Sequence, residues 1–170
     1  MTVKFLGSIL IIVGSGGVGM ALISYDRQQM NAMQDLHHCL QWMCWELQYK
    51  RLPLENLARE ATTHYDGVIG QVMGVFADEL QQQCLPNPSV CMDAAIANVK
   101  KVPKRAAYHL HRLGASLGAF DLENQLRSLE AEQRLCGQEL EQMRAGMQIR
   151  SRNYRTLSLC AGTALVIILL

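Results

Sequence analysis

The two ends of this chain are apolar stretches without a single charged side chain. Residues 5–25 contain no Asp, Glu, Lys or Arg in 21 positions, and residues 156–170 contain none in 15. About 20 helical residues, rising 1.5 Å each, span the roughly 30 Å hydrocarbon core of a bilayer. We therefore predict that 5–25 is a transmembrane helix, that 156–170 is a second, shorter one, and that 26–155 forms a domain between them.

Each apolar stretch has an alternative interpretation. Gly19-Met20-Ala21 offers a cleavage site, so the first stretch would also suit a secretory signal peptide. Export would place six cysteines in an oxidising compartment, but they lack the regular spacing of a disulfide framework. The second stretch would suit a buried C-terminal helix, yet residues 164–170 have no polar face for water. We favour two retained anchors.

Basic residues close to the anchors predict their orientation. Arg27, Arg150, Arg152 and Arg155 flank the inner ends, whereas Lys4 is the one basic residue on the outer side. The positive-inside rule then places residues 26–155 in the cytoplasm, where thiols stay reduced. With the opposite orientation, Cys84 and Cys91 would be able to pair across the Pro86-Asn87-Pro88 loop.

The charge balance of the central domain argues against one class of partner. All 15 acidic residues and all but one of the 16 basic residues lie in it, so its formal net charge is zero. We therefore expect no nucleic acid among its partners. About 130 residues without repeats or low-complexity linkers fit one small domain.

Apolar residues recur at helical spacing throughout this domain. One seam follows the first anchor and comprises Met33, Leu36, Leu40, Met43 and Leu47. A second seam precedes the second anchor and comprises Leu122, Leu126, Leu129, Gln133, Cys136, Leu140, Met143 and Met147, with Asp121 as the expected helix cap. We predict that these two helices pair antiparallel as a stalk rooted in the membrane.

Between the two seams, prolines and glycines divide the chain into shorter helices. Pro53 and Asp66-Gly67 bound one segment, and Ile69, Phe76 and Leu80 lie on the apolar face of the next. Ser89 is the expected cap of a third helix, after Pro86 and Pro88. Pro103 and Gly118 bound a fourth, which carries Leu110 and Leu113. The sequence thus predicts an all-α fold of about six helices.

A glycine pattern in the first anchor permits a nucleotide-dependent enzyme as an alternative. Gly14, Gly16 and Gly19 match GxGxxG, but a dinucleotide fold also needs a second strand that ends in an acidic residue, and the region around Asp35 is helical in pattern. Small residues four apart instead let another transmembrane helix approach closely. We assign this packing role to the pairs Ser15/Gly19 and Gly17/Ala21.

No constellation predicts catalysis, a metal or a cofactor. The candidate metal ligands are His37, His38, Cys39 and Cys44, or His109 and His111. Side chains of residues that are adjacent or two apart point to different sides of a helix, so these sets are poorly placed to bind one ion. They are better explained as structural or surface residues. The carboxylates of 122–141 are expected to form a solvated face. Trp42 and Trp45 are expected in the core, or alternatively in a groove for a partner helix.

Over nearly its whole length, the chain resembles the stage III sporulation protein AB family of endospore-forming Firmicutes. The resemblance lies in four places: FLGSILIIVGSGGVGM at 5–20, Leu52-Pro53-Leu54 followed by Glu55 and Leu57, Leu113-Gly114-x-x-Leu117-Gly118 followed by Asp121, Asn124 and Gln125, and Tyr154 with its apolar tail. Residues 84–106 share only helical character with the family, which is not expected to have their double-proline loop and extra cysteines.

This resemblance implies a function. Members of the family belong to the stage III sporulation A group, a transenvelope complex between mother cell and forespore, and resemble the platform proteins of type II secretion and type IV pilus systems. It implies a non-enzymatic scaffold in the outer forespore membrane on the mother-cell side, which couples a cytoplasmic secretion-type ATPase to membrane proteins of the complex. A homo-oligomer is also compatible with it. The alternative from another class is a membrane-anchored receptor or sensor with a ligand pocket in the helical domain.

Two sets of residues are predicted to bind partners. The first is the corner of Leu113, Gly114, Leu117, Gly118, Asp121 and Gln125, where helix-ending glycines precede a cap. The second is the densest basic cluster of the domain, Lys100, Lys101, Lys104 and Arg105, which would suit an acidic partner or anionic headgroups.

Overall fold

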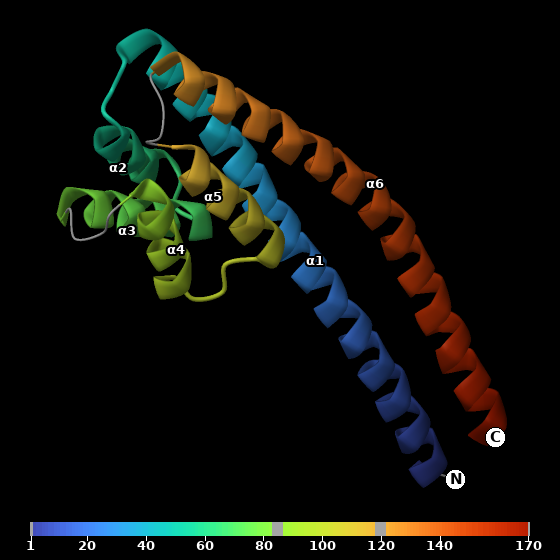
Figure 1. The fold of residues 1–170 in the computed structure, drawn as a ribbon. Coiled ribbons are helices and arrows are strands. Elements are labelled where there is room, and N and C mark those ends of the chain that lie inside the picture. Colours follow the sequence, from blue (N-terminus) through green and yellow to red (C-terminus); the bar gives the residue numbers. More distant parts are fainter. Residues whose placement is uncertain (1, 83–86, 118–121, 170) are drawn as a thin grey trace. The chain divides into compact units, whose positions relative to one another are not determined.

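Six helices make up the fold in a computed structural model of the chain (Figure 1). The structure describes the backbone of residues 2–82, 87–117 and 122–169, and the side chains of 24–82, 87–117, 122–147 and 156. The helices are α1 (Thr2–Lys50), α2 (Leu54–His64), α3 (Val68–Gln82), α4 (Pro88–Asn98), α5 (Lys104–Ser116) and α6 (Leu122–Leu169). The described residues contain no strand, so the predicted all-α class and its number of helices are confirmed.

The chain divides into two compact units. One contains residues 1–28 and 142–170, and the other contains residues 29–141. The second, which we call the helical unit, holds the C-terminal part of α1, the whole of α2 to α5 and the N-terminal part of α6. All site geometry described below belongs to this unit.

The two long helices run antiparallel inside the helical unit. The thiol of Cys136 donates to the backbone carbonyl of Met33 at 3.7 Å, and His37 Nδ1 lies 3.2 Å from the carbonyl oxygen of Gln133. The contact four residues later on α1 is therefore made three residues earlier on α6, which shows that the two helices are antiparallel. The predicted α1 seam is confirmed as core, since Met33, Leu36, Leu40, Met43 and Leu47 are all buried. The continuation of a stalk to a membrane stays a prediction.

Successive helices of the unit alternate in direction. His64, at the end of α2, stacks 5.1 Å from Trp42, and Gly67 approaches Asp35 farther back along α1. The loop at 99–103, between α4 and α5, lies at the same end of the unit as Gly67. Arg105, just after this loop, contacts Glu139, which is close to the point where α6 leaves the unit. The loops at 65–67 and 99–103 therefore lie at the end of the unit that α1 enters and α6 leaves.

Two helix starts differ from the sequence prediction. Asn87, rather than Ser89, caps α4: its side-chain oxygen accepts a hydrogen bond from the Val90 N–H at 3.0 Å. The reason is that Pro88 suits the first helical position, where a missing N–H costs nothing, so the helix starts before Ser89. Pro53 is the residue before α2 rather than a member of its first turn. The expected caps Asp121 and Gly118 lie outside the described residues.

Candidate functional site

The predicted basic cluster lies on the loop between α4 and α5 and at the start of α5. Lys100, Lys101 and Lys104 are exposed, and none of them forms an ion pair with a described residue. Lys101 has a φ of 67°, in the left-handed region that favours glycine or asparagine. Arg105 differs from the three lysines, because its guanidinium bonds to Glu139 of α6. Within the described part of the chain, the cluster thus offers three cations without an ion-pair partner rather than four.

The predicted corner is mostly buried where the structure describes it. Leu113, Gly114 and Leu117 lie in the core, and Gln125 is half-buried in the first turns of α6. Gly118 and Asp121 lie outside the described residues. A Cβ atom on Gly114 would be 2.5 Å from the Cβ of Met92, so this glycine permits the close packing of α4 and α5. Direct partner contact by these residues stays a prediction.

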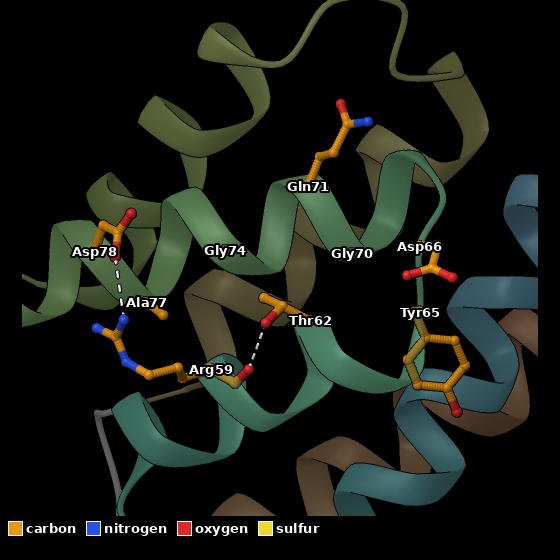
Figure 2. Close-up of a pocket in the computed structure, with 9 residues that line it drawn as sticks. All are labelled: Arg59, Thr62, Tyr65, Asp66, Gly70, Gln71, Gly74, Ala77 and Asp78. Atoms are coloured by element: carbon orange, nitrogen blue, oxygen red, sulfur yellow. Dashed lines mark hydrogen bonds and ion pairs between the residues drawn. The ribbon is translucent and has the colours of Figure 1, made fainter.

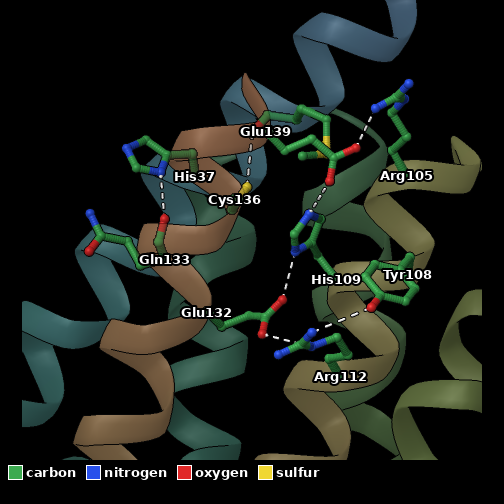
Figure 3. Close-up of polar contacts among 10 residues, drawn as sticks. His37, Arg105, Tyr108, His109, Arg112, Glu132, Gln133, Cys136 and Glu139 are labelled. Carbon is green, nitrogen blue, oxygen red and sulfur yellow. Dashed lines mark hydrogen bonds and ion pairs between the residues drawn. The ribbon is translucent and has the colours of Figure 1, made fainter. Parts of the chain in front are cut away.

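A charged network that the sequence analysis missed joins α5 to α6 (Figure 3). His109 is 3% exposed, and its Nδ1 lies 2.6 Å from Glu132 Oε1 while its Nε2 lies 2.9 Å from Glu139 Oε2. Arg112 donates from Nε to Glu132 Oε2 at 3.1 Å, and Arg105 donates to Glu139. Each of the two carboxylates therefore accepts from His109 and from one arginine.

The network shifts the protonation of its members. The hydrogen bond to Glu132, together with that to Glu139, raises the pKa of His109 above 6.5 and outweighs the opposite effect of burial. Burial alone would raise the pKa of Glu139, but hydrogen bonds from His109 and Arg105 lower it. The arrangement stabilises an imidazolium between two carboxylates.

This network corrects one expectation, that the carboxylates of 122–141 form a solvated face. Glu132 is 5% exposed, so the carboxylates of 122–141 do not form a uniformly solvated face. His109 is a buried structural residue, whereas His111 on the same helix is exposed and pairs with Asp93 of α4. The spacing of Glu132 and Glu139, two turns apart on one side of α6, was the available signal.

A groove of about 420 Å³ follows the α2–α3 hairpin (Figure 2). Its one arginine, Arg59, is already engaged: it pairs with Asp78 inside the groove and with Glu55 beside it, and it donates to Gln81. Its glycines serve helix packing, because a Cβ on Gly70 would be 1.5 Å from the carbonyl oxygen of Tyr65, and one on Gly74 would be 3.3 Å from Thr62. These contacts give the groove a structural explanation and no preference for a ligand.

The other candidate ligands and aromatic residues lie apart. In the part of the chain that the structure describes, no group of three or more His, Cys, Asp or Glu side chains is placed to hold a metal ion. Cys39, Cys44, Cys91 and Cys136 are free thiols. Trp42 is half-buried, but Trp45 is 53% exposed and stacks 5.2 Å from Tyr49, itself 67% exposed. The expectation of Trp45 in the core is therefore wrong, because none of the described helices covers this face of α1.

The backbone of α1 and α6 is helical through most of the predicted anchors 5–25 and 156–170. Side chains there, including those of Ser15, Gly17, Gly19 and Ala21, lie outside the described residues, except at 24, 25 and 156. Among the side chains that are described, no helix offers a stretch long and apolar enough to cross a membrane.

Comparisons with known proteins agree with the fold. The family profile described as stage III sporulation protein AB matches residues 4–170. A solved structure titled stage III sporulation protein AB superposes with a TM-score of 0.62 at 14% sequence identity, covering 71% of this chain and 97% of that one. At that identity the likeness is evidence of a shared fold. No curated protein matches the chain.

Proposed function

The chain belongs to the stage III sporulation protein AB family, and we propose that it is a non-enzymatic, membrane-anchored scaffold of the stage III sporulation A complex. In this proposal it couples a cytoplasmic secretion-type ATPase to membrane proteins of the complex between mother cell and forespore. The observation that carries the proposal is the family match, which extends over residues 4–170 and so includes both apolar ends as well as the helical unit.

Membrane anchoring is supported by the sequence and by the course of the helices. Residues 5–25 and 156–170 carry no charge, and α1 and α6 continue through most of both stretches as helices. α1 enters the helical unit at the same end at which α6 leaves it. Both ends of the chain would then enter one bilayer, the outer forespore membrane, with the helical unit in the mother-cell cytoplasm.

A binding role is supported by the surface of the helical unit. Lys100, Lys101 and Lys104 present charge that is not neutralised within the described part of the unit. Trp45 and Tyr49 present two large aromatic side chains on one helix face. Aromatic residues are enriched at protein–protein contacts, and a positive patch on one partner meets a negative patch on the other. In the proposal, the basic loop contacts an acidic surface of a partner.

The direct test is co-purification of the full chain with the ATPase of its own complex in mild detergent. The informative variant is Lys100→Glu with Lys101→Glu, which reverses the charge of the loop without touching the core. We expect at least about a tenfold loss of retained ATPase, since like charges across an interface cost several kcal/mol. Arg127→Glu with Arg134→Glu, on exposed positions of α6, is the matched control and should retain it.

Each outcome separates parts of the proposal. Equal loss of retained ATPase in the lysine and arginine double variants would show that the basic loop has no specific role in binding. Absence of ATPase from the purified wild-type chain would contradict the coupling role. A Gly114 substitution is unsuitable here, because the resulting clash with Met92 would disturb the core.

Packing within the bilayer has its own test. Replacing Gly17 and Gly19 by Leu should leave membrane insertion intact and weaken co-purification of partner membrane proteins or of a second copy, because larger side chains keep transmembrane helices apart. Unchanged co-purification would contradict this packing role.

A further inference from the structure

His109 of α5 lies between two carboxylates of α6, and we propose that it is a doubly protonated clasp that holds α5 on α6 and releases it on losing one proton (Figure 3). The clasp is a positioning device, because it acts through Glu132 and Glu139. It also sets where the start of α5 lies, next to Lys100, Lys101 and Lys104, to which the proposed function assigns a partner. Its test needs no partner and does not rest on that function.

Hydrogen-bond chemistry requires the double protonation. A carboxylate only accepts, and a neutral imidazole has one N–H donor and one lone pair. Both ring nitrogens of His109 lie within 2.9 Å of a carboxylate oxygen, so each of them must donate. Arg112 and Arg105 donate to the same two carboxylates and favour their ionised forms. The histidine, rather than a glutamic acid, therefore carries the additional proton.

The charged groups around the ring come from two helices. α5 contributes Arg105, Arg112 and the hydroxyl of Tyr108, which accepts from Arg112 at 3.4 Å. α6 contributes Glu132 and Glu139, with the thiol of Cys136 between them in sequence. With an imidazolium, three cations surround two carboxylates; the pKa of His109, raised by these carboxylates, agrees with that state.

Loss of the proton would act on this junction more than on the other contacts of α5. A neutral His109 would turn a lone pair toward one carboxylate inside the unit, where such a contact is repulsive. The contact of α5 with α4 is different in kind, since Gly114 packs on Met92 and His111 pairs with Asp93 at the surface. The α5–α6 junction is therefore the one that titrates with His109.

The first measurement is ¹⁵N NMR of the full chain in detergent micelles with labelled histidine. His109 is assigned by its loss in His109→Gln, and His111→Gln on the same helix is the control. We expect both ring nitrogens of His109 to show predominantly protonated shifts at pH 6.5, the ordinary pKa of histidine, because folding raises the pKa of His109 above it. A neutral tautomer at that pH would overturn the proposal.

The second measurement is hydrogen exchange of residues 104–116, expressed as protection relative to α3. Above the pKa of His109, wild-type protection should fall by up to tenfold per pH unit, the limit for release of one proton. His109→Gln should show low protection that no longer depends on pH, and His111→Gln should behave like the wild type.

Constant protection in the wild type and in His109→Gln would contradict the clasp even if the imidazolium is present. Glu139→Gln keeps the test usable if His109→Gln does not fold, because Glu139 is partly exposed. This variant removes one anion and should move the titration of His109 to lower pH. An unmoved titration would also contradict the proposal.

Discussion

Gly114 lies so close to Met92 that a Cβ atom on the glycine would be 2.5 Å from the Cβ of the methionine. We expect Gly114→Ala to destabilise the protein by about 1–3 kcal/mol, as overpacking of a core does, despite the higher helix propensity of alanine. Thermal unfolding of the full chain in detergent measures this. In a Met92→Gly background, which removes that Cβ, the same substitution should cost less; an equal cost in both backgrounds would show that Met92 is not the obstacle.

Gly70 should tolerate substitution even less than Gly114. Its Cβ would be 1.5 Å from the backbone carbonyl oxygen of Tyr65, which no rotamer change can relieve. Gly70→Ala should therefore cost more than about 3 kcal/mol, beyond the usual range of overpacking. Gly74→Ala is the matched control on the same helix, because its Cβ meets only the Thr62 methyl group at 3.3 Å. Similar melting temperatures for the two variants would refute this prediction.

Stability should decrease as the pH rises through the folded-state pKa of His109. Its pKa is raised on folding, so the folded state binds the proton more tightly than the unfolded state. The stabilisation is fully present below pH about 6.5, the ordinary pKa of histidine, and is lost above the raised pKa of His109. Its size is about 1.4 kcal/mol for each pH unit by which the folded-state pKa exceeds the ordinary one. Denaturant unfolding between pH 6 and 9 measures it. His109→Gln should flatten this dependence and His111→Gln should not; a steep dependence that persists without His109 would assign it elsewhere.

Two core thiols should be unreactive in the folded protein. Burial, with a smaller effect of Asp35, raises the pKa of Cys39 to about 12, and burial with nearby Glu132 raises that of Cys136 to about 12. At pH 7.5 only about 3 in 10⁵ of such thiols are ionised, and the thiolate is the reactive form. Mass spectrometry after brief iodoacetamide treatment should find both unmodified. Unfolded protein is the control and should be modified at both; rapid modification of the folded protein would mean that the α1–α6 seam opens readily.

The number and extent of the helices could be predicted because they depend on local patterns. Met33, Leu36 and Leu40 repeat at helical spacing, and that repeat alone indicates one buried face. The start of α4 was placed two residues late, since Asn87 and Ser89 are both good caps and only the position of Pro88 decides between them.

The charged network could not be predicted in the same way, because its parts come from different helices. Glu132 and His109 are 23 residues apart, and nothing in the spacing along α6 indicates which helix will cover Glu132. Gly114 illustrates a related ambiguity. A glycine near a helix end suits both a turn and a close helix contact, and only the position of Met92 shows that this one serves packing.

The pairing of α1 with α6 has a consequence for protein synthesis. His37 and Gln133 are 96 positions apart, and Met33 and Cys136 are 103 apart, so α6 is the last part of the helical unit to be made. At about 5–20 residues per second, the α1 seam waits roughly 5–20 seconds for its partner. During that interval the nascent chain exposes an apolar stripe beside the ribosome. Substitutions that enlarge this stripe should therefore reduce the yield of new protein before they alter the stability of the finished fold.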